Sequence, residues 1–317
     1  MTSALPSDTD PGTSLTYRPG YPVPVRMILS TMRRGAGDPS QQHTPDGAVW
    51  RASLMPSGPV SYRISQRARD VVEVTAWGPG SAELLAGLPD LLGAGDRPET
   101  FTADHPVLLR AIRDVPGYRV PRTGRVVEAL VPAVLEQKVI GLDAFAAWRR
   151  LLQWHGTPAP GPVPDGMRVP PDAATWLEIP TWDWHRAGVD PKRQRALRSV
   201  LRIADKLQML AETGDPSDFQ VLYRAMRSVP GIGVWTAAEV GSRALGDADA
   251  LPLGDYHLPA TAGYALVGRK LADDEVEPLL EPYRPHRYRV VRLLELSPSV
   301  RIPRFGPRLS RLDHRRR

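Results

Sequence analysis

Residues 228–258 read SVPGIGVWTAAEVGSRALGDADALPLGDYHL, and this stretch decides the fold. One helix is expected to end at Ser228 and another to begin near Trp235, with Pro-Gly-Ile-Gly forming the tight turn between them. Gly231 and Gly233 can both adopt positive φ angles in such a turn. Successive backbone N–H groups then point outward at a helix start, which suits a site for one phosphate. The alternative is an ordinary helical hairpin closed by a glycine turn.

Outward from the hairpin, the sequence divides into four parts. Residues 1–16 are polar and contain Pro, Gly and Asp, and we expect them to be disordered. Residues 17–104 carry short β-branched segments separated by turn residues, which predict a small α+β N-terminal domain. Residues 105–299 change to apolar residues spaced three or four apart, which predict a helical bundle. Residues 300–317 form an Arg-rich tail. The predicted fold class is therefore α+β.

The positive charge of the chain is concentrated at one end. The 317 residues include 41 Lys or Arg and 35 Asp or Glu, a net charge of +6. Residues 301–317 alone hold seven Arg and one Asp, so the remainder of the chain is balanced. The tail therefore either contacts nucleic acid or merely aids solubility.

Several kinds of site are excluded by what the sequence lacks. There is no cysteine, which excludes disulfides, thiolate zinc sites and iron–sulfur clusters. No apolar run reaches the ~18 residues that a membrane helix needs. Residues 1–15 have neither the basic start nor the apolar stretch of an export signal. We therefore expect a soluble cytoplasmic protein that does not contact a membrane.

Several segments of the chain resemble one family. The hairpin VPGIG, the WTAAE after it, the linker ALGDADALP and an Asp about twenty residues past the hairpin resemble the helix-hairpin-helix DNA glycosylases. Within that superfamily, the pattern is most similar to the 3-methyladenine DNA glycosylase II branch. The segments LEQKVI at 135–140, GVDPKR at 188–193 and YRPHR at 283–287 look like further parts of the branch's pattern. The resemblance covers about residues 105–297, and the strands before residue 90 are similar to the branch's small N-terminal β-α-β domain.

The resemblance implies a monofunctional glycosylase that acts on double-stranded DNA containing damaged bases. Such an enzyme flips an alkylated purine out of the duplex and hydrolyses its N-glycosidic bond. Asp255 matches the family's catalytic carboxylate, which would stabilise positive charge on the sugar and position the attacking water. Asp255 also precedes a predicted helix start and could be only an N-cap, although both roles are compatible. Trp235 stands where lyase members carry a Schiff-base lysine, so no lyase activity is expected.

The pocket for the flipped base is expected to contain Trp235, Glu239, Tyr256 and His286. Trp235 can stack on a cationic alkylpurine and attract it by a cation–π interaction. Glu239 lies one helical turn further on, where the family often has an aromatic residue. Its carboxylate would attract a cationic base, bond an amino group, or simply lie on the surface. His286 also replaces an aromatic residue, and a protonated imidazole there would repel a cationic base.

The expected DNA contacts lie in the hairpin and in two other turns: Val229, Gly231, Ile232, Gly233, Gln137, Lys138, Lys192 and Arg193. Lys138 stands where the family inserts a side chain into the duplex, usually Leu or Gln. Either its aliphatic stem fills the gap in the base stack, or a neighbour such as Val139 or Ile140 does. The alternative is that Lys138 is a solvated residue at a helix end.

The family also implies a monovalent cation bound by the carbonyls of Val229, Gly231 and Gly233. No other cofactor is expected, and the protein is expected to be a monomer. Two alternatives to this function remain. One is a non-catalytic protein that recognises damage or DNA structure through the hairpin. The other is a glycosylase for bulky adducts or deaminated bases, which an open acidic pocket around Glu239 would favour.

Overall fold

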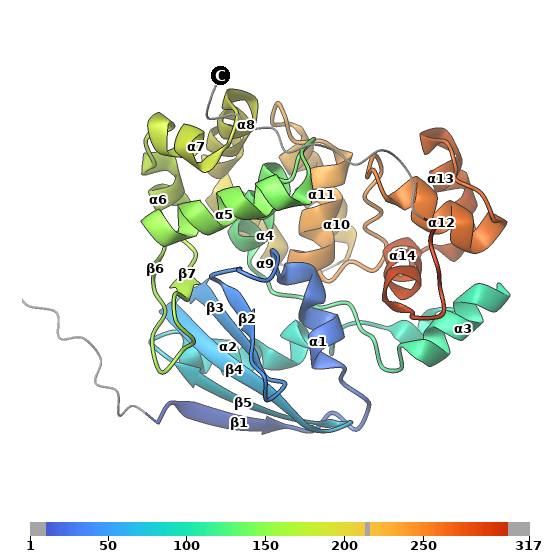
Figure 1. The fold of residues 1–317 in the computed structure, drawn as a ribbon, viewed down its shortest axis with the longest axis horizontal. Coiled ribbons are helices and arrows are strands. Elements are labelled where there is room, and N and C mark those ends of the chain that lie inside the picture. The colour runs from blue at the N-terminus through green and yellow to red at the C-terminus, as the bar shows by residue number, and fades with distance from the viewer. Residues whose placement is uncertain (1–10, 213–215, 304–317) are drawn as a thin grey trace, which may run out of the picture.

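The computed structural model describes residues 11–212 and 216–303 of the chain. It contains an antiparallel sheet that is followed by many helices, so the predicted α+β fold class is confirmed. The sheet lies at one end of the molecule, and the helices occupy the other end (Figure 1). Its five strands are β1 (Thr13–Tyr17), β2 (Gln41–His43), β3 (Val49–Met55), β4 (Gly58–Ala68) and β5 (Val71–Trp77).

The sheet has the order β1-β5-β4-β3-β2. Alternation in β5 buries Val72, Val74 and Ala76, as expected for a strand with one face on a core. Helix α2 (Ser81–Leu91) follows β5 directly and packs Leu84 and Leu88 into the same core. The other short helices of this part are α1 (Val25–Ile28), η1 (Leu29–Met32) and η2 (Pro98–Thr100).

Strand β1 corrects the expected disorder of residues 1–16 for the residues from Thr13 onward. It pairs antiparallel with β5, from Thr13 opposite Ala76 to Tyr17 opposite Val72. The pairing satisfies backbone groups at an edge of β5 that would otherwise be open, which local composition does not reveal. Residues 1–10, and residues 304–317 of the Arg-rich tail, lie outside the described residues.

The helical part begins at α3 and surrounds a core centred on α4. Eight of the ten residues of α4 are buried, among them Pro132 inside the helix. The helices are α3 (Pro106–Asp114), α4 (Val126–Leu135), α5 (Gly141–His155), α6 (Ala173–Glu178), α7 (Thr181–Ala187), α8 (Pro191–Leu201), α9 (Ala204–Glu212), α10 (Pro216–Arg227), α11 (Val234–Val240), α12 (Leu258–Val267), α13 (Asp273–Leu280) and α14 (Arg287–Leu296). A π-helical turn, η3 (Gly241–Leu245), a 3-10 turn, η4 (Glu281–Tyr283), and a two-stranded ribbon, β6 (Thr157–Pro158) with β7 (Arg168–Val169), complete the elements.

One apolar cluster contains residues from both the sheet and the helical part. Tyr288 and Leu293 of α14 are buried in the same cluster as the sheet residues Val72 and Val74. A second cluster unites α4 with α5 to α11. In Figure 1, α3 and α12 to α14 form a lobe beside the sheet, while α5 to α8 lie on the other side. The hairpin helices α10 and α11 are therefore held between two packed groups of helices.

No helix among the described residues has both the length and the apolar character needed to cross a bilayer.

Candidate active site

The hairpin joins α10 to α11 through residues 228–233, as the sequence predicts. The backbone N–H of Ile232 donates to the carbonyl of Val229 across the turn, with an N···O distance of 3.0 Å. Gly231 has a φ of +91°, which confirms the expected left-handed conformation there. The same expectation for Gly233 is wrong, because Gly233 is the extended N-cap of α11, with a φ of −99°. An N-cap residue needs β-region backbone angles, and this requirement overrides the freedom of glycine.

Contacts with two neighbouring elements fix the hairpin turn. A Cβ added at Gly231 would lie 2.8 Å from the Cβ of Ala196, so the turn rests directly on α8. The side-chain amide of Gln137, just past α4, donates to the carbonyl of Gly231 at 3.0 Å and to the hydroxyl of Thr236 at 2.8 Å. Gln137 was expected to contact DNA, but its amide nitrogen is used to tie α4 to the hairpin.

The predicted cation ligands are carbonyls that already accept hydrogen bonds from the protein. Val229 accepts from Ile232, Gly231 accepts from Gln137, and the carbonyl of Gly233 accepts the N–H of Ala237 at 3.1 Å. Each carbonyl has a second lone pair, so these bonds do not block a cation. The cation stays a prediction.

Asp255 lies beside the hairpin helix, and its carboxylate is fixed from two sides. Oδ1 accepts the backbone N–H groups of His257 at 2.7 Å and Leu258 at 3.0 Å, at the start of α12. Oδ2 accepts the indole N–H of Trp235, from the first turn of α11, at 3.2 Å. Asp255 therefore binds the first N–H groups of a helix and also contacts the hairpin. A half-buried carboxylate that is held in this way has a defined orientation and faces the positive end of a helix dipole.

Two predicted pocket residues lie next to this carboxylate. Trp235 is half-buried, and its indole N–H bonds Asp255. Tyr256 follows Asp255 and is exposed, with its ring edge-on to that of His257 at 5.2 Å. The ammonium of Lys270 lies 5.7 Å from the centre of the Tyr256 ring. The structure thus brings Trp235, Asp255 and Tyr256 together.

Glu239 is buried and paired, so it does not make an open acidic pocket. It lies one turn beyond Trp235, and its carboxylate contacts the guanidinium of Arg243 in η3 at 2.8 Å. Burial raises the pKa of Glu239 above its usual value; Arg243 opposes this effect, and the negative charges of Glu136 and Asp255 add to it. Trp235, one turn before Glu239 on α11, bonds Asp255, so both carboxylates lie beside this helix.

Glu239 and Arg243 belong to a cluster of four charges that also includes Arg34 and Glu136. The Nε of Arg34 lies 2.8 Å from Oε1 of Glu136, at the end of α4. Burial lowers the pKa of Arg34, and the neighbouring Glu136 opposes that change. Sequence reasoning missed Arg34, Glu136 and Arg243, because residues so far apart along the chain give no local pattern.

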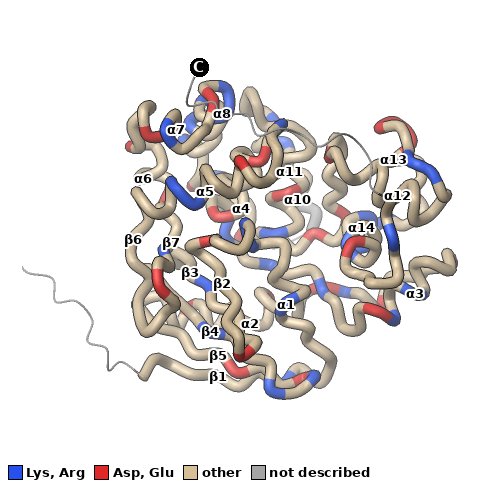
Figure 2. Tube along the Cα trace, in the orientation of Figure 1, with Lys and Arg blue, Asp and Glu red and all other residues tan. Residues whose placement is uncertain are grey.

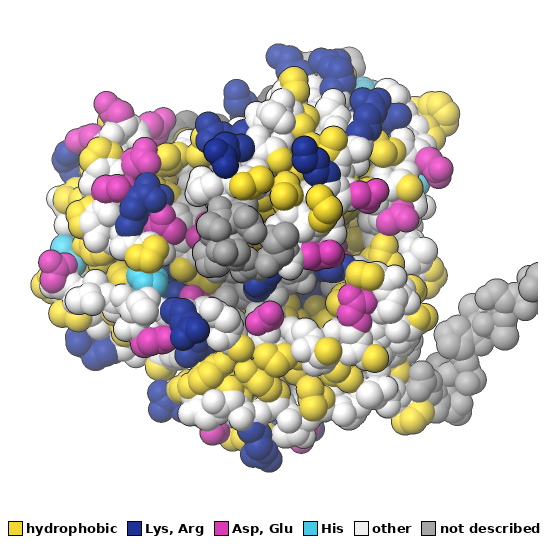
Figure 3. Space-filling view, turned by 180° about the vertical axis from the view of Figure 1, so that it is seen from behind, with side chains coloured by type: hydrophobic (Ala, Val, Ile, Leu, Met, Phe, Trp, Pro, Cys, Tyr) yellow, Lys and Arg dark blue, Asp and Glu magenta, His cyan; other side chains and the backbone are white. Residues whose placement is uncertain are grey.

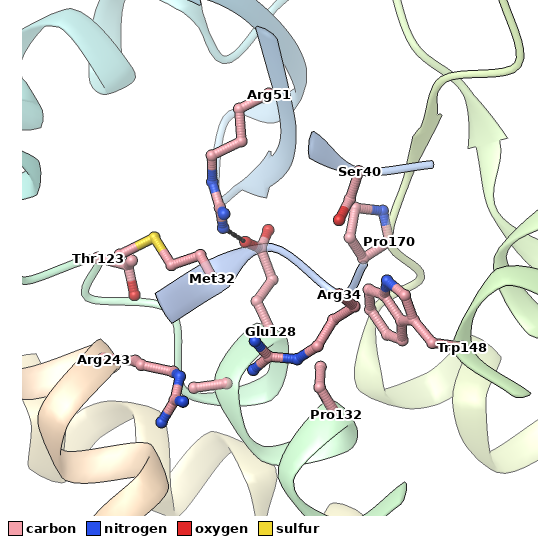
Figure 4. Close-up of a pocket in the computed structure, with 11 residues that line it drawn as sticks. Met32, Arg34, Ser40, Arg51, Thr123, Glu128, Pro132, Trp148, Pro170 and Arg243 are labelled. Atoms are coloured by element: carbon pink, nitrogen blue, oxygen red, sulfur yellow. Dashed lines mark hydrogen bonds and ion pairs between the residues drawn. The ribbon is translucent and has the colours of Figure 1, made fainter. Parts of the chain in front are cut away.

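A small cavity lies between the sheet and α4; its lining includes Arg34, Arg243 and the ion pair of Arg51 with Glu128 (Figure 4). Its volume of about 20 Å³ has room for roughly one water molecule. Neither Trp235 nor Asp255 lines it. This cavity is therefore too small for a base and is separate from the Asp255 site.

The structure places His286 outside this group of residues. Its side chain is buried at the start of α14, where Nε2 bonds the hydroxyl of Thr100 at 2.8 Å and Nδ1 accepts from Nε of Arg289 at 3.1 Å. The ring packs against Phe101, with 5.4 Å between centres. Burial and the nearby Arg289 lower the pKa of His286. The expected pocket role of His286 is therefore corrected, since its contacts are with η2 and α14.

The three basic residues that were expected to contact DNA have different environments. Lys138 is exposed, in the turn between α4 and α5, and has a φ of +53° that non-glycine residues seldom adopt. Lys192 is exposed in the first turn of α8. Arg193 is buried instead; its guanidinium donates to the carbonyls of Leu135 at 2.5 Å and Gly188 at 3.2 Å. The expectation that Arg193 contacts DNA is corrected, because its donors hold α8 against α4.

Comparison with known proteins supports the resemblance. No protein-family model matches the chain. Two curated relatives, probable bifunctional transcriptional activator/DNA repair enzymes AlkA from Mycobacterium tuberculosis strains CDC 1551/Oshkosh and ATCC 25618/H37Rv, are each 33% identical over 165 residues. The match covers 52% of this chain and 32% of each relative, so the chain spans about a third of their length.

Solved structures match over most of the chain. A 3-methyladenine DNA glycosylase from Archaeoglobus fulgidus has a TM-score of 0.72 at 15% identity, covering 89% of this chain and 97% of its own. MBOgg1 in complex with a low-affinity DNA ligand gives 0.72 at 14% identity, over 91% of this chain and 96% of its own. The 8-oxoguanine glycosylase/lyase of Clostridium acetobutylicum has a TM-score of 0.69 at 11% identity, covering 90% of this chain and 96% of its own. These likenesses confirm the predicted resemblance in fold.

Proposed function

We propose that this chain, which has the fold of the helix-hairpin-helix DNA glycosylases, is a monofunctional glycosylase that hydrolyses the N-glycosidic bond of alkylated purines in double-stranded DNA. The observation that carries the proposal is the position of Asp255. Its carboxylate is fixed by the start of α12 and by Trp235, directly beside the hairpin. Such a placement can hold a negative charge next to a deoxyribose whose phosphate lies on the hairpin.

In the proposed reaction, the damaged nucleotide leaves the base stack and its sugar approaches Asp255. As the bond between C1′ and the base breaks, positive charge develops on the sugar, and the carboxylate stabilises it. The same carboxylate orients a water that adds to C1′, which leaves an abasic site and the free base. Trp235 offers an aromatic face to the cationic base.

The hairpin and the turns around it would hold the DNA during this step. The exposed N–H groups of the hairpin would bind a phosphate, with a monovalent cation on the carbonyls of Val229, Gly231 and Gly233. Lys138 stands in the exposed turn from which a side chain could enter the gap left by the base. Its aliphatic stem would fill part of the gap while the ammonium reaches a phosphate.

We expect base excision without strand cleavage. A lyase reaction needs an amine that forms a Schiff base with C1′. The residue after the hairpin that would supply it is Trp235, and no lysine occurs between Lys206 and Lys270. Incubation with damaged duplex should therefore give abasic sites that break only after alkali treatment. Direct strand cleavage by the purified protein would contradict this expectation.

The decisive experiment compares Asp255→Asn with the wild-type protein. The substitution removes the negative charge but keeps the shape of the side chain, so DNA binding should persist while base release falls about 10²-fold or more. Asp172→Asn is a matched control, because Asp172 caps α6 through the N–H of Thr175 and lies in another part of the chain. Near-normal release by the Asp255 variant would show that this carboxylate is not catalytic.

The lesion needs its own test, because the fold of the 8-oxoguanine glycosylase/lyase named above matches with a TM-score of 0.69, close to the 0.72 of the 3-methyladenine enzyme. We propose alkylated purines, since Trp235 offers an aromatic face for a cationic base and the carboxylate of Asp255 places negative charge beside it. A panel of duplexes with methylated, oxidised and deaminated bases, scored for released base, distinguishes the candidates. Specific binding without release from any of them would favour the non-catalytic alternative.

A further inference from the structure

Helix α8 carries an unusual run of positive charge. Its sequence, PKRQRALRSVL, contains four basic residues and no acidic one, and Arg202 follows at the C-cap in helical conformation. A solvated surface helix normally mixes both signs of charge. Figure 2 shows basic residues in blue on the helices α7 and α8 at the top of the molecule.

Two of these side chains are used inside the protein. Arg193 is buried and bonds the carbonyl of Leu135, and the guanidinium of Arg198 lies 3.4 Å from the carbonyl of Ile179. The remaining three, Lys192, Arg195 and Arg202, are exposed. Within residues 11–212 and 216–303, none of these three forms an ion pair. Their charge is therefore not neutralised by the part of the chain that the structure describes.

The three exposed charges lie on one strip of α8 beside the hairpin. Ala196 faces the hairpin at Gly231, and Gln194 faces α7 through a 3.2 Å bond to the hydroxyl of Thr181. At about 100° per residue, these two contacts lie on nearly opposite sides of the helix. The arc between Ala196 and Gln194 holds the three exposed charges: Lys192, Arg195 and Arg202 lie about 40°, 100° and 120° from Ala196. The strip thus starts at the hairpin and continues along the outer side of α8.

We propose that this basic strip of α8, made of Lys192, Arg195 and Arg202, binds the DNA backbone beyond the hairpin. The inference rests on the proposed function for its partner, double-stranded DNA. From Lys192 to Arg202 the helix rises about 15 Å, a length over which one strand of a duplex presents roughly four phosphates. Seen from behind, dark-blue side chains gather in the upper part of the molecule (Figure 3). Arg195 and Arg202 add two phosphate contacts to those of the hairpin and Lys192.

Salt dependence of binding tests the strip directly. Each phosphate contact contributes about −0.9 to the slope of log K against log salt concentration. The double variant Arg195→Ala/Arg202→Ala should therefore make the slope less negative by about two and weaken binding at low salt about tenfold or more. The matched control is Arg110→Ala/Arg113→Ala, which removes two exposed charges from α3, on the other side of the molecule (Figure 1). The probe is an undamaged duplex oligonucleotide.

Two further measurements separate charge from fold and the strip from the reaction. Arg195→Lys/Arg202→Lys should restore the wild-type slope, because a phosphate contact needs the charge more than the guanidinium shape. Base release by the wild-type protein, measured separately from binding, tests the reaction. If the alanine double variant has the same slope as the control, the strip does not bind the DNA backbone, even when excision is normal. If the alanine double variant has a less negative salt slope but the wild type releases no base, the proposed reaction is wrong. The DNA-binding role of the strip is then still supported.

Discussion

At the scale of single residues, the defining feature is the bond between Trp235 and Asp255. One residue offers the aromatic face, the other offers the charge, and the 3.2 Å contact links them across twenty positions of the chain. The two backbone N–H groups from α12 restrain only Oδ1, so Trp235 controls where Oδ2 points. We therefore assign Trp235 a positioning role for Asp255 in addition to stacking.

Trp235→Phe separates these two roles. The phenyl ring keeps an aromatic face but loses the indole N–H, so Asp255 should turn more freely. A hydrogen bond to a charged group contributes about 1.5–3 kcal/mol, and we expect the maximal rate of excision to fall about tenfold with little change in DNA affinity. Trp182→Phe is the control, because Trp182 is 68% exposed on α7. An equal loss in both variants, or a loss of affinity alone, would contradict the positioning role.

Glu239 gives a prediction about pH. Its pKa is raised in the folded protein because it is buried, so it keeps its proton at pH values where the unfolded chain has lost it. A group that binds more protons in the folded state makes stability fall as pH rises, here from about 4.3 upward through the folded pKa. Glu239→Gln removes this effect, so the stability of the variant relative to wild type should increase with pH.

Urea unfolding of both proteins between about pH 4.5 and 7 measures this difference. Glu178→Gln, which removes an exposed carboxylate at the end of α6, is the control for a general charge effect. A constant difference between Glu239→Gln and wild type over the whole range would show that Glu239 does not titrate there.

At the scale of elements, the hairpin depends on glycines that allow neighbouring helices to approach its backbone closely. A Cβ at Gly241, the first residue of η3, would lie 1.9 Å from the hydroxyl oxygen of Tyr223 in α10. That hydroxyl donates to Asp247 at 2.6 Å, just after η3. Tyr223 therefore packs the π-helical turn against the hairpin helix α10. In the same way, the absence of a side chain at Gly231 lets the hairpin turn lie against α8. Short helices such as α11 are stable here because of this packing rather than because of intrinsic propensity.

Gly231→Ala tests the contact with α8. The variant must place a Cβ in the left-handed region and against Ala196, so both strain and crowding destabilise it. Gly47→Ala is the matched control: Gly47 has a φ of +90°, but a Cβ there would meet nothing within 4 Å. Crowding alone should make Gly231→Ala about 1–3 kcal/mol less stable than the control in urea unfolding. Equal losses in the two variants would show that the turn can move away from α8.

At the scale of the whole molecule, the sheet and the helices are joined by polar groups as well as by the shared core. Asp38 is fully buried and accepts the N–H of Arg34 at 2.6 Å, the N–H and hydroxyl of Ser40, and the indole N–H of Trp148 at 2.9 Å. Trp148 belongs to α5, so this carboxylate connects the N-terminal part to the helical part. Glu128 of α4 likewise connects the helical part to β3, by accepting hydrogen bonds from Arg51, Ser53 and Leu54.

Asp38→Ala should therefore destabilise the whole molecule. It leaves buried donors on both parts without an acceptor, and we expect a loss of about 3–5 kcal/mol in the free energy of unfolding. Because the parts share a core, the loss should appear in a single transition seen both by circular dichroism and by tryptophan fluorescence. Asp70→Ala, at an exposed turn between β4 and β5, should change stability by less than about 0.5 kcal/mol. A normal transition for Asp38→Ala, or two separate transitions, would contradict this coupling.

The sequence by itself determined the hairpin, the change from a strand-rich part to a helical part, and the proximity of Asp255 to the next helix start. Those features depend on turn chemistry and on hydrophobic spacing, which act within a few residues of each other. Only the tertiary structure decided that Arg193 and His286 are buried and that Glu239 pairs with Arg243. It also showed that Gln137 secures the hairpin. The availability of a polar side chain depends on which distant groups surround it, and this is fixed only when the whole chain packs.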